Sequence, residues 1–346
     1  MNHTKTWNRA VRTLAGAATA IGLGLFTLAS AWAQKPEPVT IRWGGTPSVE
    51  LETPFYVAVA KGYFEEEGIK VGSPMMGPGP RVREALAAGD IDFADVGTLT
   101  YIVGRGKGLP QKLVFEYYTR EIFSILVPAK LKNEIKTVAD LKGRKVLVNA
   151  LGAASHVAGL SFVRRSGLKD TDVSFVGVGA GGDPATWVAT METGKFDAGI
   201  TWEPTTTLLI DRNSAFALVD IRDPATHEKL IAKNASSMTL AVSETLIAQR
   251  PEVIQRVVRA LKKATAFIQK NSPAEVAKAT VAGGFKMDEA LLARILQPIK
   301  GNFSADGRIS RSGIEVEVEL GLAAKILDKK LRFEDMVDPK FAGSKD

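Results

Sequence analysis

The sequence contains no cysteine among its 346 residues. The chain can therefore carry neither a disulfide bond nor a lipid-modified cysteine. An oxidising compartment is compatible with such a chain, but core burial alone must stabilise the fold. The roughly 310 residues that follow residue 33 are enough for a large core and for two domains.

Histidine is also scarce, with only His3, His156 and His227. His3 lies in the N-terminal segment described below, and the other two are ~70 residues apart with no carboxylate spaced to complete a metal site. The sequence has no G-x-S-x-G motif, no phosphate-binding loop with its lysine, and no nucleophile beside an obvious base. We therefore predict no catalytic residue, no metal and no cofactor. The expected protein binds a ligand and is not an enzyme.

Long apolar runs are limited to one, Leu14 to Leu28, which carries no charge. It follows the basic residues Lys5, Arg9 and Arg12 and precedes the small-x-small site Ala31-Trp32-Ala33. This order predicts a signal peptide over residues 1–33. The run is shorter than the ~20 apolar residues of a membrane span, which leaves an uncleaved anchor as the alternative. We expect a soluble exported protein without a lipid anchor, located in the periplasm if the source is bacterial.

The net charge is small for a chain of this length. Of the formal +7, three charges belong to the basic residues of the N-terminal segment, which has no acid, so +4 remains. Lysines and arginines are scattered among acids, as at Lys61 before Glu65 to Glu67. No basic arm or stripe indicates a nucleic-acid partner, and a modest attraction for small anions is as much as this charge provides.

Strands alternate with helices in the first half. Val39–Trp43 alternates as a strand and ends in the small polar loop Gly44–Ser48. Thr53-Pro54 predicts the start of a helix, Phe55–Lys61 its body, and the later strand Ile91–Val96 ends at Gly97-Thr98. This alternation predicts βαβ units and a mostly parallel sheet, with ligands outside the carboxyl ends of the strands.

The stretch from Lys145 to Val163 combines a strand, a loop of small residues and a helix start. Lys145–Asn149 is the strand, Ala150–His156 the loop, and a helical face begins at Val157. A helix N-terminus after such a loop suits an anion, because unpaired N–H groups and a partial positive charge face the ligand. An ordinary turn in which Ser155 is the N-cap is the alternative.

The two halves of the chain share a local pattern. Gly89 and Gly194 each stop a helix and precede an aspartate by three residues, Asp92 and Asp197. This repetition predicts two lobes of similar fold, in which the aspartates stabilise turns and do not catalyse. From Met238 onward the pattern changes to helices whose apolar stripes are packing faces.

Five sequence blocks occur in the order found in substrate-binding proteins of nitrate, sulfonate and taurine ABC importers. They are Lys61-Gly62-Tyr63-Phe64-Glu65-Glu66-Glu67-Gly68, Ala85-Leu86-Ala87-Ala88-Gly89-Asp90-Ile91-Asp92-Phe93, Ala139-Asp140-Leu141-Lys142-Gly143-Arg144-Lys145-Val146, Gly152-Ala153-Ala154-Ser155-His156 and Trp202-Glu203-Pro204. The sequence resembles this family over nearly all of the chain from Val39. The resemblance implies an α/β, two-lobed periplasmic-binding-protein fold in which each lobe is a mostly parallel sheet flanked by helices.

The same resemblance implies two hinge crossovers. We expect lobe one, with the C-terminal helices, over residues 36–122 and 238–346, and lobe two over residues 123–237. The hinges are expected near Thr119–Ile122 and Ser236–Thr239. The family's ligand site lies in the cleft between the lobes. The ligand-binding residues that the resemblance implies are Thr46, Ser48, Gly97, Thr98, Thr119, Gly152, Ala153, Ser155, His156, Trp202 and Glu203.

The strand-end positions in this set agree with the strand pattern itself. No arginine falls at a matched cleft position, so neutral donors and helix ends are expected to hold an anion. Two residues remain open. Glu203 either faces the cleft, where it repels an anion or pairs with an amine, or begins a helix before Pro204. His156 either faces the ligand or is a capped, packed histidine.

The implied function is solute capture for an ABC importer. A monomeric protein binds a small anionic or zwitterionic ligand of the sulfonate, taurine, nitrate or carboxylate class, closes, and docks transiently on the permease. An enzyme of the same fold acting on a pyrimidine-precursor-like substrate is one alternative, although the absence of cysteine and the few histidines oppose it. A sensory protein that presents its ligand to a membrane receptor is another.

Overall fold

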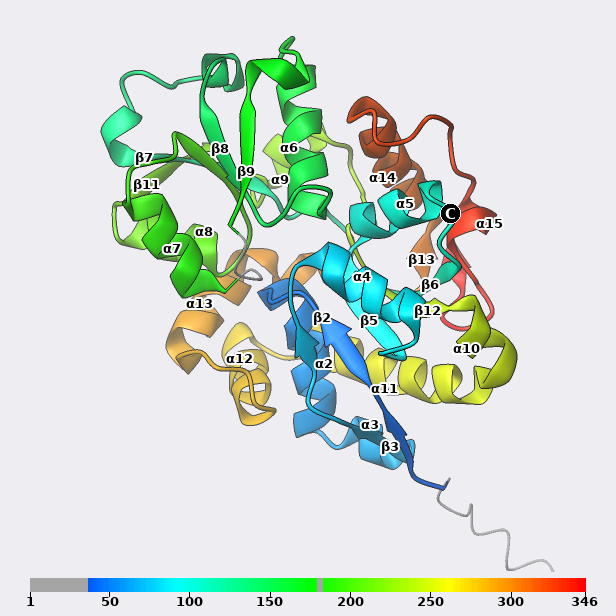
Figure 1. Ribbon diagram of the computed structural model, residues 1–346. Coiled ribbons are helices and arrows are strands. Elements are labelled where there is room, and N and C mark those ends of the chain that lie inside the picture. The colour runs from blue at the N-terminus through cyan, green and yellow to red at the C-terminus, as the bar shows by residue number, and fades with distance from the viewer. Residues whose placement is uncertain (1–36, 179–182) are drawn as a thin grey trace, which may run out of the picture. The chain divides into compact units, whose positions relative to one another are not determined.

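The computed structural model of the protein describes residues 37–178 and 183–346. The signal peptide predicted over residues 1–33 lies outside the described residues. Two five-stranded sheets, each flanked by helices, form two lobes (Figure 1). The lobe of the first sheet contains the amino-terminal and carboxy-terminal elements, and the lobe of the second sheet contains the middle of the chain.

The first sheet has the order β4-β2-β5-β12-β6. Its strands are β2 (Trp43–Gly45), β4 (Met75–Met76), β5 (Phe93–Gly97), β6 (Gln111–Tyr118) and β12 (Met238–Ser243). Strand β12 is antiparallel to both β5 and β6, while the other pairs in the sheet are parallel. A separate parallel pair, β1 (Val39–Ile41) with β3 (Ile69–Val71), extends the amino-terminal end of this lobe.

The second sheet has the order β11-β7-β10-β8-β9. Its strands are β7 (Ser124–Pro128), β8 (Lys145–Val148), β9 (Ser174–Gly177), β10 (Ala198–Thr201) and β11 (Ala215–Val219). Strand β7 is antiparallel to both of its neighbours, and β10-β8 and β8-β9 are parallel. Each sheet thus has one reversed strand in the same position, and the prediction of a two-lobed α/β fold with mostly parallel sheets is confirmed.

Helices connect these strands and cover both sheets. The first lobe contains α2 (Val49–Ala60), α3 (Tyr63–Glu66), α4 (Gly79–Ala88) and α5 (Thr98–Gly106). The second lobe contains the short 3-10 helices η1 (Ala129–Leu131), η2 (Val138–Leu141) and η3 (Asp170–Asp172), with α6 (Ala154–Arg165), α7 (Pro184–Glu192), α8 (Thr205–Asp211) and α9 (Pro224–Leu230). The carboxy-terminal part contains α10 (Glu244–Gln249), α11 (Pro251–Lys270), α12 (Pro273–Ala282), α13 (Glu289–Ile299), η4 (Lys300–Asn302), β13 (Ile309–Ser310), α14 (Arg311–Ala323), α15 (Phe333–Met336) and β14 (Ser344–Lys345).

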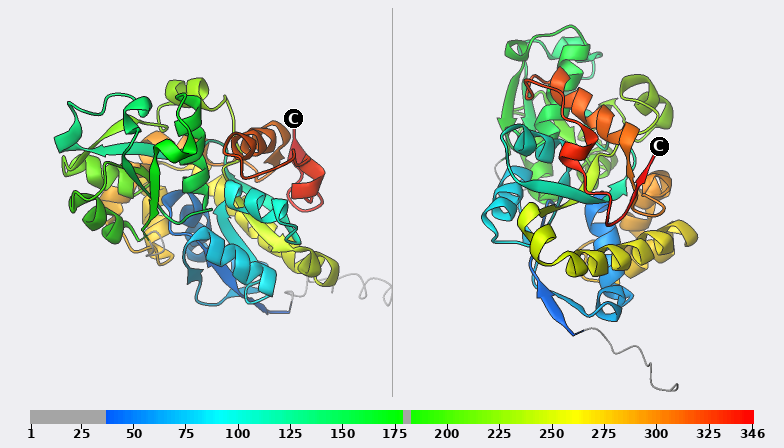
Figure 2. Two further views of the ribbon diagram at one scale, coloured as in Figure 1. Left: turned by 45° about the horizontal axis from the view of Figure 1, so that its top comes forward. Right: turned by 90° about the vertical axis from the view of Figure 1, so that its right-hand side faces the viewer.

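The carboxy-terminal helices bury the apolar faces that their periodicity predicted. Helices α11 and α12 pack on α2, and α14 packs on α5 and on α6 of the other lobe (Figure 2). The side chains of α11 that face inward, among them Val257, Leu261 and Ile268, are almost fully buried. Within the part of the chain that the structure describes, no helix has both the length and the apolar character needed to cross a bilayer.

The start of α2 differs from the prediction at Thr53-Pro54. The helix begins at Val49, because the Ser48 hydroxyl accepts the N–H of Leu51 at 3.1 Å and the Glu52 carboxylate accepts the N–H of Ser48 at 3.1 Å. These bonds satisfy N–H groups that have no partner in the first turn. The predicted start was wrong because proline is tolerated inside the helix close to its amino end.

The start of α6 differs from the alternative in which Ser155 is the N-cap. The helix begins at Ala154, with Ala153 as an N-cap that makes no side-chain bond. Ser155 is the second helical residue, and its hydroxyl accepts the backbone N–H of Asn149 at 3.1 Å. The hydroxyl therefore closes the turn between β8 and α6 instead of capping the helix.

The two aspartates of the repeated pattern have the same structural task in the two lobes. The Asp92 carboxylate accepts the N–H of Arg42 at 2.8 Å, and the Asp197 carboxylate accepts the N–H of Lys145 at 2.9 Å. Arg42 precedes β2, and Lys145 begins β8, the corresponding strand of the other sheet. Each aspartate therefore ties the end of a turn to the start of the corresponding strand, β2 in one sheet and β8 in the other.

Candidate ligand-binding site

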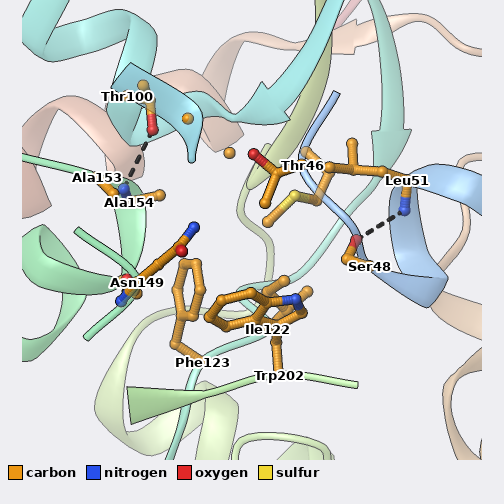
Figure 3. A pocket seen from close by; sticks show the side chains of 14 residues that line it. Thr46, Ser48, Leu51, Thr100, Ile122, Phe123, Asn149, Ala153, Ala154 and Trp202 are labelled. Carbon is orange, nitrogen blue, oxygen red and sulfur yellow. Dashed lines mark hydrogen bonds between the residues drawn. The ribbon is translucent and has the colours of Figure 1, made fainter. Parts of the chain in front are cut away.

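A cavity in the cleft between the two lobes holds about 320 Å³ of space free of protein atoms, including its opening to solvent. Strand-end loops, first turns of helices and the crossover at Ile122 and Phe123 line it (Figure 3). None of the lining side chains is charged. The lining residues are Thr46, Ser48, Leu51, Gly79, Gly97, Thr100, Ile122, Phe123, Asn149, Ala153, Ala154, Ser155, Trp202 and Met238.

The first-lobe wall is held in place by the backbone around it. The N–H of Thr46 donates to the carbonyl of Asp95 at 3.2 Å, and the Thr46 hydroxyl donates to the carbonyl of Gly77 at 3.1 Å. Ser48 is fixed by the capping bonds at the start of α2. The hydroxyls of this wall therefore have defined positions before any ligand binds.

The second-lobe wall consists of Asn149 and the first turn of α6. The backbone of Asn149 is tied to Ser155, and its side chain is 3% exposed. Among the residues that the structure describes, the Asn149 Oδ1 atom has no hydrogen-bond partner. Figure 3 shows this side chain on the same side of the cavity as Ala153 and Ala154.

Aromatic rings form the opposite wall. Trp202 follows β10, and its ring contacts Phe123 edge-on, with centroids 5.8 Å apart, and Trp187 in the same manner at 5.5 Å. In Figure 3, Trp202, Phe123 and Ile122 lie together across the cavity from Thr100. A ligand between the walls therefore has polar groups on one side and apolar rings on the other.

Three hydrogen bonds join the lobes beside the cavity, in addition to those of Arg164 with the carbonyl of Ala323 and of Arg294 with Asp211 elsewhere. The N–H of Ala154 donates to the Thr100 hydroxyl at 3.1 Å, and Trp202 Nε1 donates to the carbonyl of Pro47 at 2.9 Å. The N–H at the start of α2 donates to the carbonyl of Glu203 at 3.4 Å. A Cβ atom at Gly97 would come within 2.6 Å of the Ala154 Cβ, so the lobes touch at this point. The arrangement is closed.

Six residues of the implied site line the cavity together. They are Thr46, Ser48, Gly97, Ala153, Ser155 and Trp202. They come from both lobes and from four different turns, as expected for strand ends that meet in a cleft. That they bind a ligand stays a prediction.

Thr98 and Thr119 do not line the cavity. The Thr98 hydroxyl pairs with the Thr239 hydroxyl at 2.9 Å, and its N–H donates to the carbonyl of Ser237 at 2.7 Å, so it connects α5 to the return crossover. The N–H and hydroxyl of Thr119 both donate to the carbonyl of Asn302, at 2.9 and 3.0 Å. Both threonines fasten the crossovers to the first lobe.

Gly152 and His156 also lie outside the cavity lining. The N–H of Gly152 donates to His156 Nδ1 at 3.0 Å, and the His156 ring packs edge-on against Phe175 at 5.1 Å. Burial lowers the pKa of His156, which favours the neutral ring that this bond requires. Of the two alternatives for His156, the structure has the packed histidine.

Glu203 turns its carboxylate away from the cavity. The carboxylate is 1% exposed, pairs with Arg222 at 2.8 Å, and accepts the N–H and hydroxyl of Thr207 at 3.2 and 2.9 Å. Burial raises the pKa of this carboxyl, against the opposing effect of the Arg222 charge. Glu203 therefore closes the first turn of α8, and its charge is compensated within the second lobe.

Several lining residues were missed by the sequence reasoning. Asn149 directly follows β8, and the strand-end rule that selected Thr46 also applies to it. Ile122 ends a predicted hinge and Phe123 begins a predicted strand of the second lobe, and neither assignment indicates contact with a ligand. Gly79 and Thr100 lie in first turns of helices and carry no motif, so no sequence signal marks them.

Metal ligands do not gather within residues 37–178 and 183–346. No group of three or more histidines and carboxylates in these residues is arranged to hold a metal ion. His227 accepts the backbone N–H of Glu121 at 2.8 Å, and its other ring nitrogen lies 2.7 Å from the carbonyl of Ala232. Both nitrogens of this ring are therefore engaged by the backbone at the crossover.

Comparison with known proteins places the chain in a family. The family model described as NMT1/THI5 like matches residues 52–275, more than half of the chain. A riboflavin-binding protein of Chloroflexus aurantiacus is 27% identical over 65% of this chain and 60% of its own length, less than two thirds of that relative. A Bacillus subtilis protein that carries the name of an aliphatic sulfonates-binding protein is 27% identical over 84% of this chain and 83% of its own.

A solved structure supports the fold. The alkanesulfonate-binding protein SsuA of Xanthomonas axonopodis pv. citri, bound to MOPS, superposes with a TM-score of 0.67, at 22% identity over 87% of this chain and 99% of that one. Periplasmic binding proteins of this kind share the two-lobed α/β architecture seen here. The chain therefore belongs to the NMT1/THI5-like family and has the fold of the periplasmic binding proteins.

Proposed function

We propose that the protein is the periplasmic solute-binding component of an ABC importer, which captures a small organic anion or zwitterion between its lobes and delivers it to the permease. The observation that carries the proposal is the uncharged cavity between two lobes that meet in a closed arrangement. Closing around a ligand removes it from water and strengthens each hydrogen bond to it. We infer that the lobes are residues 36–122 with 238–346, and residues 123–237.

The polar wall supports a ligand with a negatively charged group. First turns of four helices contribute to the lining, namely α2, α4, α5 and α6. Helix N-termini carry a partial positive charge, which favours an anion without any lysine or arginine. The sequence has no arginine at a matched cleft position, and for that reason helix ends and neutral donors are expected to hold an anion.

The apolar wall supports an organic part on the same ligand. Trp202, Phe123, Ile122, Leu51 and Met238 offer ring and alkyl surface with no polar atom that lacks a partner within the described residues. Burying such surface against a hydrocarbon part is favourable by about 25 cal/mol per Å². We therefore place sulfonates, taurine and carboxylates ahead of nitrate, which has no apolar part.

The proposed movement uses the two crossovers as hinges. Thr119 is bonded to the first-lobe carbonyl of Asn302, and Thr98 to the carbonyl of Ser237 at the return crossover. These bonds hold the crossovers on the first lobe, and we infer that the second lobe moves as a unit. Opening then breaks the three bonds beside the cavity and exposes it to solvent. We propose that the closed, ligand-bound form docks on the permease as a monomer, in the periplasm.

A thermal-shift panel tests this proposal. Taurine, alkanesulfonates, nitrate and short carboxylates are added to ligand-free protein, and a ligand at 100 times its Kd is expected to add ~2.7 kcal/mol and about 5 °C to the Tm. Gly97→Leu is the blocked variant, because a side chain there collides with Ala154, and it should lose the shift. Gly301→Ala is the matched control, since a Cβ at Gly301 has no neighbour within 4 Å. A wild-type Tm that no member of the panel raises would contradict ligand capture of this class.

The alternative of an enzyme is opposed by the state of the two histidines. His156 and His227 are both engaged by backbone groups, and neither lines the cavity. We expect a bound ligand to be recovered unchanged after long incubation, as checked by mass spectrometry. Turnover that is present in the wild type and lost in His156→Ala would reverse this proposal.

A further inference from the structure

The Asn149 amide differs from every other polar side chain of the cavity wall. The other polar groups are engaged by protein atoms: Thr46 with the carbonyl of Gly77, Ser48 with the N–H of Leu51, Thr100 with the N–H of Ala154, Ser155 with the N–H of Asn149, and Trp202 with the carbonyl of Pro47. The Asn149 side chain is 3% exposed, and its Oδ1 has no partner among the described residues. A buried acceptor without a donor is destabilising unless something supplies that donor.

The position of Asn149 makes the ligand the natural source of that donor. Its backbone N–H is held by the Ser155 hydroxyl, which fixes the place in the wall from which the side chain extends. Figure 3 shows the amide beside the α6 turn, facing the space between the polar wall and the Trp202 ring. Asn149 lines the cavity, so a ligand bound there is a group that can supply the missing donor.

The uncharged lining gives a second constraint. A ligand that enters this cavity loses its water and meets no countercharge from a lining side chain. A net charge is costly to desolvate under these conditions, whereas a zwitterion carries its own countercharge. An ammonium group beside an acidic group also supplies the N–H that Oδ1 lacks.

We propose that Asn149 is a specificity-determining residue, which selects ligands that combine an acidic group with a hydrogen-bond donor by accepting that donor at Oδ1. This inference rests on the proposed function and names which part of the ligand class the site prefers. An amino-substituted sulfonic or carboxylic acid binds more tightly than the unsubstituted acid of the same length. The acidic group is held at the helix N-termini and the amino group at Asn149.

Isothermal titration calorimetry with three ligands of one skeleton tests the inference. Taurine has an ammonium donor and no net charge, isethionate has a hydroxyl donor and a net charge, and ethanesulfonate has no donor. We expect taurine to bind about tenfold more tightly than ethanesulfonate, with isethionate between them, since one hydrogen bond in a desolvated site is equivalent to about this factor.

The variant Asn149→Leu removes the amide and keeps a similar volume. It should weaken taurine binding about tenfold and change ethanesulfonate binding less than threefold. Ser161→Ala is the matched control, because Ser161 Oγ is also buried without a partner on α6 but lies outside the cavity lining, and it should leave all three affinities unchanged. If Asn149→Leu does not fold, as judged by circular dichroism, Asn149→Ala takes its place in the same comparison.

The outcomes separate this inference from the proposed function. Equal affinity of the wild type for taurine and ethanesulfonate, or an equal loss of both in Asn149→Leu, overturns the role of Asn149 and leaves solute capture standing. A wild-type protein that binds none of the three ligands overturns the inference. If it also gives no shift in the wider panel, the proposed function falls with it.

Discussion

The two lobes share one scaffold and differ at the positions that line the cavity. The bonds of Asp92 to Arg42 and of Asp197 to Lys145 fix the correspondence between the sheets. Counting along the strands from these bonds, Thr46 corresponds to Asn149 and Gly97 to Trp202. All four of these residues line the cavity. The repeated fold therefore supplies the positions, and the side chains at those positions have diverged.

The corresponding residues of the two lobes differ in hydrogen bonding and in side-chain size. In the first lobe Thr46 satisfies its hydroxyl on the carbonyl of Gly77, whereas the Asn149 amide in the second lobe has an open acceptor. Gly97 contributes no side chain and lets Ala154 approach, whereas Trp202 fills the space and reaches Pro47. The first lobe thus provides a closed surface, and the second provides the large ring and the open polar group. The following predictions test this division, from the largest effect to the smallest.

Trp202→Ala should have the largest effect on stability. The ring is 3% exposed and contacts both Phe123 and Trp187, so its loss leaves a cavity and removes the bond to Pro47. We expect a loss of about 3–5 kcal/mol in the free energy of unfolding, measured by urea denaturation. Trp202→Phe keeps most of the ring and should lose less than half as much. A loss below 1 kcal/mol for the alanine variant would mean that this corner is not part of the folded core.

Arg222→Met tests how the second lobe compensates its buried acid. The variant leaves the Glu203 carboxylate, which is 1% exposed, with Thr207 alone. We expect a loss of about 3 kcal/mol, because an uncompensated buried charge is strongly destabilising. Adding Glu203→Gln removes that charge and should recover a large part of the loss. A double variant no more stable than Arg222→Met would contradict the pairing.

The first lobe contains a buried acid without such a partner, and it predicts a pH dependence. Glu50 is 2% exposed, and its Oε2 has no partner in the described part of the chain. Burial, with a contribution from the Glu203 charge, raises the pKa of Glu50 to about 8. The folded state therefore holds a proton that the unfolded state releases above its ordinary pKa, so stability falls as pH rises from about 4.5 to about 8.

The window from pH 6.5 to pH 8 covers the upper part of this range. Burial also raises the pKa of Glu52 to about 8 and that of Glu121 to about 7, so the Glu50→Gln variant, and not the wild-type slope alone, identifies Glu50. Burial lowers the pKa of His227 to about 4, which has the opposite sign but acts below pH 6.5. We expect Glu50→Gln to lose about 2 kcal/mol less than the wild type across the window, measured by urea denaturation at several pH values. Glu244→Gln, at an exposed acid, should leave the wild-type slope unchanged. An unchanged slope in Glu50→Gln would show that this carboxyl is not the proton carrier.

Removing the repeated aspartates should have the smallest effect and compares the lobes directly. Asp92→Ala and Asp197→Ala each delete an acceptor of a strand N–H, and we expect each to cost about 1–2 kcal/mol. Similar losses in thermal and urea unfolding would support a common structural task. A loss of ligand binding without a loss of stability in either variant would contradict it.

The fold could be predicted because its signals are local and repeated. Glycines at helix ends, alternating strands and the paired aspartates each mark one element, and their order specifies the βα units. The start of α2 was missed because Ser48 and Glu52 compete with Thr53-Pro54, and only the bonds formed decide between them. A helix boundary therefore depends on interactions that a pattern leaves open.

The site could be predicted only as a set of loops. The rule of strand ends selects positions but not directions, so it treats Gly97 and Thr98 alike, although one lines the cavity and the other bonds to Thr239. The rule also selects Glu203, which follows a strand but turns its carboxylate to Arg222. The sequence does not indicate that these two residues lie close together. Whether a polar side chain has a hydrogen-bond partner depends on residues that are close in space but distant in the sequence.

The place of β12 has a consequence for the order in which the protein can form. In the first sheet this strand lies between β5 and β6, and it comes from Met238–Ser243, after the whole second lobe. A chain synthesised from its amino end has β6 ready long before the strand that joins β6 to the rest of the sheet. The edges of β5 and β6 that face each other are joined only by β12, which follows the second lobe in the sequence. The first sheet is therefore complete only after the second lobe has been synthesised. During that interval the facing edges of β5 and β6 have no partner strand, so the incomplete sheet can pair with other chains until β12 arrives.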